Sequence, residues 1–235
     1  MKKSNKIIGL IGGMGPYASA YFYKLLLQKS GLLYGARNND DYPEIVIDSV
    51  PVPDFISDTK RINEAKGMLI DRVKSLNGFG CDAIAMVCNT GHIFYEDLAK
   101  QSKCEFVSLV ELVVNKVKER RLTKVGLLAT STTVDSGLYG KPLSHLGTEV
   151  VNPSKEMQQA HERIIRDVIA GKESSQYEHY FYEATREFIE KNDLRGIILG
   201  CTELPLVFPK NGFEKVIDCL DVLADELLAR YYKNN

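Results

Sequence analysis

Ile84-Ala85-Met86-Val87-Cys88-Asn89-Thr90 and Ile197-Ile198-Leu199-Gly200-Cys201-Thr202-Glu203 are the two stretches that decide the fold class. In each, a short apolar run ends at a cysteine and polar residues follow, which is typical of a buried strand that enters a turn. Strands this uniformly apolar occur in parallel sheets that helices cover on both faces. The two cysteines are 113 residues apart, so two separate strands position them.

Strand-like and helix-like segments alternate along the whole chain. This alternation predicts an α/β fold, because parallel strands need a crossover connection that is usually a helix. Ligands of such folds bind at the carboxyl ends of the strands, where both cysteines fall. The expected strands span 7–12, 44–50, 83–88, 124–130, 196–201 and 215–217, and the expected helices span 17–30, 60–77, 94–101, 109–121, 136–146, 155–170, 176–192 and 220–232.

The chain contains two similar halves. Gly9 and Gly126 lie in similar apolar runs 117 residues apart, close to the 113 that separate the cysteines. Any doubly wound fold repeats strands to some degree, but landmarks that recur in order favour a duplicated unit. We expect two pseudo-symmetric parallel-sheet α/β domains with the active site in the cleft between them. The first comprises residues 1–105 plus 210–235, and the second comprises residues 106–209.

Composition excludes several classes of function. The 235 residues carry a net charge of −1, which provides no basic surface for nucleic acid. No apolar run approaches the roughly 20 residues that a membrane-spanning helix needs. The five cysteines are odd in number, which favours a reducing compartment over a disulfide framework. The N-terminus resembles a signal peptide, but glycines interrupt its apolar run, so we expect a cytoplasmic protein.

Cys88 and Cys201 are candidate acid/base groups. Cysteines in strands are usually structural, and Cys81, Cys104 and Cys219 fit that interpretation. Cys88 and Cys201 differ because each precedes a polar turn, whose N–H groups can lower a thiol pKa from about 8.5. A thiol and a thiolate on opposite sides of one carbon can exchange its proton with inversion. The matched pair therefore predicts proton transfer of the racemase type without a cofactor.

A glycine-rich turn, Gly12-Gly13-Met14-Gly15-Pro16, follows the first strand. With Ala18 it formally matches the dinucleotide fingerprint, but the acidic residue required about 20 residues later is missing from a strand end. Pro16 also removes one N–H donor. A small anion, such as a substrate carboxylate, therefore suits the turn better. The matching place in the second half, Thr130-Ser131-Thr132-Thr133, offers hydroxyls and amides.

Two polar residues near the cysteines have alternative interpretations. His92 could join Cys88 and Cys201 in a zinc site, but structural zinc sites generally need four ligands at close spacings. We favour one structural hydrogen bond for His92, with a role as a base in second place, and we expect no metal. Glu203 either orients Cys201 or is a solvated turn carboxylate, and the sequence does not separate these two roles.

The motifs together resemble the aspartate/glutamate racemase family, and most closely its aspartate racemase branch. The matching motifs are Gly12-Gly13-Met14-Gly15-Pro16, Cys88-Asn89-Thr90-Gly91-His92, Gly126-Leu127-Leu128-Ala129-Thr130 and Gly200-Cys201-Thr202-Glu203. The resemblance implies two similar α/β domains, no cofactor, an amino-acid or carboxylate substrate and commonly a homodimer. It assigns acid/base catalysis to Cys88 and Cys201, and substrate contacts to Met14, Asn89, Thr90, Thr130, Thr202 and Glu203.

Two positions depart from the aspartate racemase branch, which usually has an arginine where this chain has Phe55 and a lysine where it has Ile169. An apolar side chain cannot replace a guanidinium, so aspartate loses two cationic partners unless Lys60, Arg61 or Lys172 reaches the site. We expect a racemase for aspartate or a related amino acid. Isomerisation of a small dicarboxylate and hydantoin racemisation are alternatives on the same two-cysteine scaffold. A non-catalytic carboxylate-binding protein is an alternative of another class.

Overall fold

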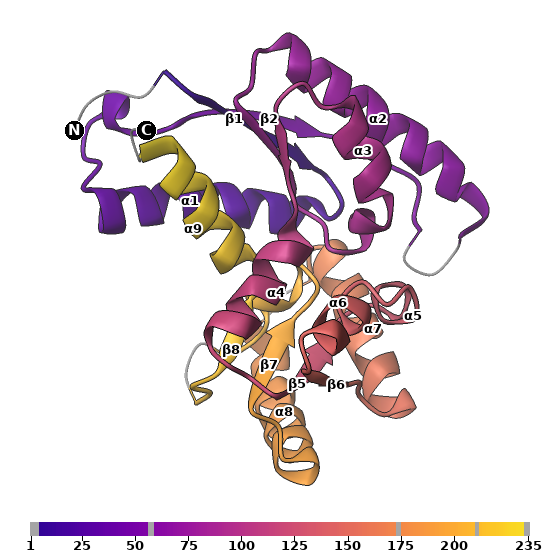
Figure 1. Ribbon diagram of the computed structural model, residues 1–235. Coiled ribbons are helices and arrows are strands. Elements are labelled where there is room, and N and C mark those ends of the chain that lie inside the picture. Colours follow the sequence, from indigo (N-terminus) through magenta and orange to yellow (C-terminus); the bar gives the residue numbers. More distant parts are fainter. Residues whose placement is uncertain (1–4, 56–58, 173–174, 210–211, 233–235) are drawn as a thin grey trace.

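Two parallel four-stranded sheets form the frame of the computed structural model, which describes residues 5–55, 59–172, 175–209 and 212–232 (Figure 1). The first sheet has the order β2-β1-β3-β4, and the second has the matching order β6-β5-β7-β8. The parallel α/β fold with two domains is confirmed. The strands are β1 (Ile7–Gly12), β2 (Glu44–Ser49), β3 (Ala83–Met86), β4 (Glu105–Val107), β5 (Lys124–Leu128), β6 (Glu149–Val151), β7 (Gly196–Leu199) and β8 (Val216–Asp218).

The strand register places the two candidate cysteines at equivalent points. Gly9 in β1 pairs with Ile84 in β3, and Gly126 in β5 pairs with Ile197 in β7. Each of these partners lies four residues before a cysteine of interest. The two sheets therefore carry Cys88 and Cys201 at the same position beyond the carboxyl end of corresponding strands, as duplication of one unit would produce.

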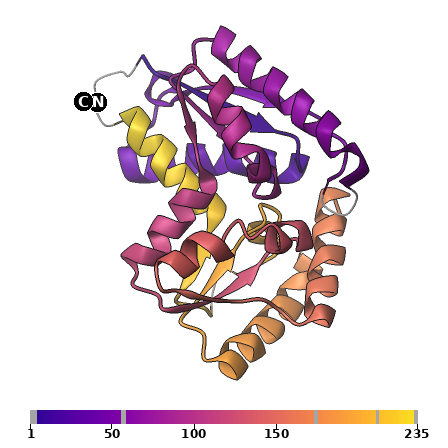
Figure 2. The same cartoon turned by 45° about the vertical axis from the view of Figure 1, so that its right-hand side comes forward.

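Helices cover both faces of each sheet (Figures 1 and 2). Gly15 precedes α1 and Pro16 occupies its first turn, where a missing N–H costs no helical hydrogen bond. Short 3₁₀ helices, η3 (Thr90–Phe94) and η5 (Leu204–Leu206), follow Cys88 and Cys201. The α-helices are α1 (Pro16–Tyr34), α2 (Ile62–Gly78), α3 (Tyr95–Gln101), α4 (Leu109–Glu119), α5 (Ser131–Asp135), α6 (Gly140–His145), α7 (Lys155–Ile169), α8 (Glu178–Asn192) and α9 (Cys219–Tyr232).

Three apolar clusters hold these layers together. The central cluster joins the two halves, because it contains β1 and β3 residues, β5 and β7 residues, and the buried faces of α1, α4, α6 and α9. A second cluster lies between the first sheet and α2 and α3. A third lies between the second sheet and α7 and α8. Cys88 belongs to the second cluster and Cys201 to the third, so each thiol is part of the core of its own half.

The helices α4 and α9 connect the halves. The helix α4 follows β4 of the first sheet, α9 follows β8 of the second, and the two helices pack against each other (Figure 1). The helix α9 also lies along α1 of the first half. The segment 210–235 thus contributes β8 to the second sheet and α9 to the packing around α1. The domain boundaries themselves stay a prediction.

The structure adds elements that the sequence pattern does not reveal. The strands β4 and β6 were absent from the expected set, the helix expected over 136–146 is shortened to α6, and α5 precedes it as an additional helix. None of the helices within the described residues is long and apolar enough to cross a membrane.

Candidate active site

Cys88 and Cys201 are both buried, each with 4% of its surface exposed. Burial is the main cause that raises the pKa of the Cys201 thiol well above its usual value, followed by the charge of Glu203. A charge on Cys88 would raise this pKa further, which indicates that the two thiols lie near each other across the junction of the halves. The fold therefore brings together two residues that are 113 positions apart in the chain.

The turn after Cys88 favours the thiolate form of this residue. The N–H group of Gly91 donates to Cys88 Sγ over 3.4 Å. Burial and the charge of Glu203 raise the pKa of Cys88 to about 12, while hydrogen bonds from the Gly91 and Thr90 backbone lower it. Burial has the larger effect on this pKa, so the Cys88 thiol is protonated at neutral pH. The turn amides reduce the free energy needed to form a thiolate there.

Glu203 is hydrogen-bonded to the Cys201 thiol. Its Oε2 accepts hydrogen bonds from Cys201 Sγ (3.0 Å) and from the Thr202 hydroxyl (3.1 Å). Its Oε1 accepts one from the Gly15 N–H group, across the junction, at 3.1 Å. Burial raises the pKa of Glu203, and these hydrogen bonds act in the opposite direction. Of the acidic and basic residues that the structure describes, histidine apart, Glu203 alone is buried, which excludes the solvated turn carboxylate.

The glycine-rich turn packs tightly against its neighbours. Gly13 has a φ of +93°, and a Cβ there would lie 2.5 Å from the Val50 carbonyl oxygen, so only glycine fits. A Cβ at Gly15 would lie 2.7 Å from Glu203 Oε1 and 3.1 Å from a side-chain carbon of Ile169. We expected an anion at this turn, and the carboxylate that the Gly15 amide binds is that of Glu203.

A second set of hydrogen bonds crosses the junction, from a residue of the first half to the turn after β5 of the second. The Thr90 hydroxyl lies 3.0 Å from the hydroxyls of both Thr130 and Thr133. The Thr130 side chain caps α5 by accepting the Thr133 N–H group at 3.2 Å. Thr90 and Glu203 both lie two residues after a cysteine, and each contacts the turn after the first strand of the opposite half. Each half of the site therefore contacts the opposite half through an equivalent residue.

Asn89 is oriented by two residues that the sequence did not indicate as part of the site. The Tyr139 hydroxyl donates to Asn89 Oδ1, and Asn89 Nδ2 donates to Cys219 Sγ at 3.2 Å. All three residues are buried. Cys219 keeps the structural role expected for it, although it lies next to the site. Thr133, which lies in the turn expected to offer hydroxyls, also had a local signal as a capping partner, because Thr-x-x-Thr matches the spacing of a helix cap.

His92 is a structural residue in this fold. Its Nε2 lies 3.0 Å from the Leu109 backbone nitrogen, which can only donate, so the ring proton is on Nδ1. Nδ1 then donates to the Cys88 carbonyl oxygen at 2.8 Å. Burial lowers the pKa of His92 to about 4, so the ring is neutral. Both nitrogens are engaged by the backbone, and among the described residues no cluster of His, Cys, Asp or Glu could hold a metal ion.

Apolar side chains surround the polar groups of the candidate site. Met14 and Phe55 are buried in the same cluster as Cys88, and the Phe55 ring meets Phe94 edge-on at 5.8 Å. Ile169, the last residue of α7, approaches Gly15. The cationic candidates Lys60, Arg61 and Lys172 are exposed, and the latter two form ion pairs with Glu64 and Asp167.

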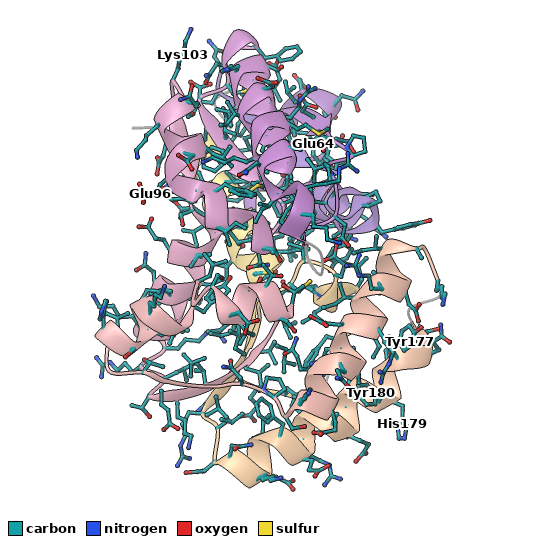
Figure 3. The ribbon with its side chains drawn as sticks, turned by 90° about the vertical axis from the view of Figure 1, so that its right-hand side faces the viewer. Glu64, Glu96, Lys103, Tyr177, His179 and Tyr180 are labelled. Carbon is teal, nitrogen blue, oxygen red and sulfur yellow. The ribbon has the colours of Figure 1, made fainter. Side chains whose placement is uncertain are left out.

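The tyrosine-rich segment at α8 is not part of this site. Tyr177 and Tyr180 lie on the outer side of the second half, away from the junction (Figure 3). The ring of Tyr180 packs edge-on against His161, so Tyr180 contributes to packing.

Comparisons with known proteins agree with this architecture. The family model for Asp/Glu/hydantoin racemases matches residues 11–227. The broad specificity amino-acid racemase of Bacillus subtilis is 29% identical over 226 residues, which cover 96% of this chain and 98% of that protein. An aspartate racemase homologue from Pyrococcus horikoshii superposes with a TM-score of 0.80 at 29% identity, covering 97% of this chain and 100% of that one. The Picrophilus torridus aspartate racemase superposes with a TM-score of 0.83 at 27% identity, covering 98% and 96%.

The family model spans nearly the whole chain, from β1 to α9. Two of these relatives combine near-complete coverage with a closely similar fold. The chain belongs to the Asp/Glu/hydantoin racemase family.

Proposed function

We propose that this protein racemises a free amino acid by transferring protons between its α-carbon and two cysteine thiols, without a cofactor. The observation that carries the proposal is the pair of buried thiols at equivalent carboxyl ends of two similar sheets. The named activity of the Bacillus subtilis relative, amino-acid racemisation of broad specificity, supports it.

The reaction needs one thiolate and one thiol at a time. The S–H group of Cys201 already points at the Glu203 carboxylate, so Glu203 can take that proton and leave a thiolate. The Cys201 thiolate then removes the α-proton from one face of the substrate. The Cys88 thiol delivers its own proton to the opposite face, which leaves Cys88 as the thiolate that its turn amides stabilise. The reverse direction exchanges the roles of the two cysteines.

The groups around the thiols have separate tasks. The hydroxyls of Thr90 and Thr130, with the backbone amides of the turns, are suited to the substrate carboxylate, where negative charge grows as the α-proton leaves. Thr202 and Asn89 border the two cysteines and complete the polar lining, while Met14 adds an apolar contact. Burial of the whole set excludes water, which strengthens each of these interactions.

The test is the fate of the α-proton in heavy water, with single Cys88→Ala and Cys201→Ala variants. The wild-type protein should place deuterium on the α-carbon of at least one L-amino acid and invert it. Each variant should lose inversion by about a thousandfold or more, because one of two obligatory proton carriers is gone. Each should retain slow exchange with one enantiomer only, since the remaining thiol faces one side of the carbon.

The control is Cys104→Ala, a thiol outside the site that should leave racemisation unchanged. Full inversion by either active-site variant contradicts the two-thiol scheme. No exchange with any amino acid would favour dicarboxylate isomerisation, hydantoin racemisation or carboxylate binding instead.

We further propose that the protein works in the cytoplasm as a homodimer. All five cysteines are free, which suits a reducing compartment. A molar mass near twice 26.4 kDa in light scattering would support the dimer, and a mass near 26.4 kDa would contradict it.

A further inference from the structure

The charge balance of the site limits which amino acids it can take. Among the described residues, Glu203 is the only carboxylate that is fully buried, no lysine or arginine is fully buried, and Glu203 accepts a hydrogen bond from Cys201. A bound amino acid brings an α-ammonium group and an α-carboxylate, and the ammonium group can offset the charge of Glu203. A second carboxylate on the substrate would add an anion to a buried site that already contains one. Buried charges without an opposite partner are strongly disfavoured.

Two apolar side chains of the candidate site, Phe55 and Ile169, offer a second carboxylate no partner. Phe55 is 3% exposed, belongs to the same cluster as Cys88 and Met14, and packs on Phe94. Its carbonyl oxygen accepts a hydrogen bond from the Thr132 side chain at 3.5 Å, which ties Phe55 to the second half. Ile169 lies against the Gly15 position on the other side of Glu203. These side chains present carbon to a substrate and no cation.

The cations near the site are engaged at the surface. Arg166 lies one helical turn before Ile169, and its guanidinium is 2.6 Å from the Asp54 carboxylate. Arg61 forms an ion pair with Glu64, and Lys172 forms one with Asp167; the Arg61 and Lys172 side chains are each more than half exposed. Each of these charges therefore already has a partner of opposite sign in water, where it stabilises little and is screened.

We infer that the site is selective for amino acids with uncharged side chains, and that Phe55 and Ile169 form the surface that receives the side chain. This inference rests on the proposed racemase function and names its substrate class. An apolar side chain gains from burial against these two residues, whereas a side-chain carboxylate loses its hydration and meets no buried cation among the residues that the structure describes.

The experiment compares L-leucine, L-asparagine and L-aspartate, which have similar shapes and differ in side-chain charge. The wild-type protein should exchange the α-proton of leucine or asparagine with a kcat/KM about 100-fold above that for aspartate, since an uncompensated like charge costs several kcal/mol. Faster exchange with aspartate than with both neutral amino acids would overturn the inference while leaving the racemase proposal intact. Absence of exchange with every amino acid would instead contradict the racemase proposal.

A variant pair tests the surface itself. Ile169→Lys places a cation beside Glu203, and it should narrow the preference for leucine over aspartate by about tenfold or more. Ile169→Met is the matched control, because it keeps a flexible apolar side chain of similar volume and should leave the preference unchanged. An Ile169→Lys protein that folds, as judged by circular dichroism, and keeps the wild-type preference would exclude Ile169 from the surface. The wild-type substrate comparison tests the inference even if this variant does not fold.

Discussion

In the proposed mechanism, the contact between Cys201 and Glu203 explains how a buried thiol with a raised pKa could act as a base. Moving the proton from Cys201 to Glu203 exchanges one buried anion for another, so the buried charge does not change. Ionising the thiol into solvent would instead add a charge to a site that is closed to water, at a cost of several kcal/mol. The distance of 3.0 Å between Sγ and Oε2 is suited to the internal transfer.

Replacing Glu203 by glutamine should change the pH dependence as well as the rate. In the wild-type protein Glu203 must be ionised to accept the proton, so kcat/KM should fall as the pH drops through the Glu203 pKa, which burial raises above its usual value. In Glu203→Gln the thiol must lose its proton to solvent. The rate at neutral pH should fall about 100-fold and then rise about tenfold per pH unit, because the thiol pKa lies well above that pH.

The measurement is the pH–rate profile of both proteins between pH 5 and pH 10. A Glu203→Gln profile parallel to that of the wild-type protein would show that Glu203 does not take the proton. Thr202→Val removes a neighbouring hydrogen bond to the same carboxylate and serves as the comparison, with a smaller loss and an unchanged profile shape.

Much of the site could be predicted at the level of single residues. Cys88 and Cys201 stand in local patterns of apolar strand, thiol and polar turn that the sequence displays openly. The partners of these residues could not be predicted in the same way. Gly15 and Glu203 are 188 residues apart, and Asn89 and Tyr139 are 50 apart, so only the folded chain shows that they meet. The contribution of Tyr139 has no local signature at all.

At the level of elements, the long strands and helices followed from periodicity, and so did short β8 and α3, but β4, β6 and α5 did not. The strands β4 and β6 contain three residues each, which is too few for an apolar pattern to stand out. The expected helix over 136–146 is interrupted because Gly137 adopts a φ of +72°, outside the helical range. The helix α5 begins earlier, where the Thr130 hydroxyl caps it, at a turn that the sequence indicated only as a ligand site.

The close contact between the glycine-rich turn and Glu203 gives a prediction for Gly15→Ala. The added Cβ would lie 2.7 Å from Glu203 Oε1 and must displace that carboxylate. Because Glu203 holds Cys201, racemisation should fall about tenfold or more while the fold is retained, since small displacements of catalytic groups are costly. Racemisation rates and circular dichroism measure the two effects.

Gly67→Ala is the control for the same change of residue. Gly67 lies inside α2, and a Cβ there would meet no atom within 4 Å. This substitution should raise stability by about 0.5–1 kcal/mol through helix propensity and leave the rate unchanged. Equal activity of the two variants would mean that the turn does not position Glu203.

At the scale of the whole molecule, two helices join the halves: α4 follows the first sheet, α9 follows the second, and the two pack against each other. The helices α4 and α9 begin at equivalent strand ends, where Ser108 and Asp218 each cap the helix that follows, and they cross at the centre. We propose that the second domain extends through β8 and that α9 alone returns to the first. One apolar cluster that includes α4, α9 and both sheets couples the halves, so a change in their angle would move the two cysteines relative to each other.

The whole fold contains two buried histidines that should make it sensitive to acid. Burial lowers the pKa of both His92 and His161 to about 4, below the value of about 6.5 in an unfolded chain. Between these values the unfolded state binds more protons. Stability is therefore fully present above pH 6.5 and is lost as the pH falls towards 4, by up to about 3 kcal/mol for each histidine.

His161→Phe should remove its share of this acid sensitivity. The His161 ring stacks on Phe181 at 5.1 Å, and neither ring nitrogen has a hydrogen-bond partner among the described residues, so phenylalanine can keep the stack without a buried polar atom. We expect an equal or greater free energy of unfolding at pH 7. Between pH 6.5 and 4 this free energy should fall less steeply, because the unfolded state of the variant takes up about one proton fewer. Urea unfolding at several pH values measures both.

The control is His179→Gln, at an exposed position on α8, which should leave the pH dependence of the free energy of unfolding unchanged (Figure 3). A His161→Phe slope equal to that of the wild-type protein would assign the acid sensitivity to His92 and to the junction that it supports.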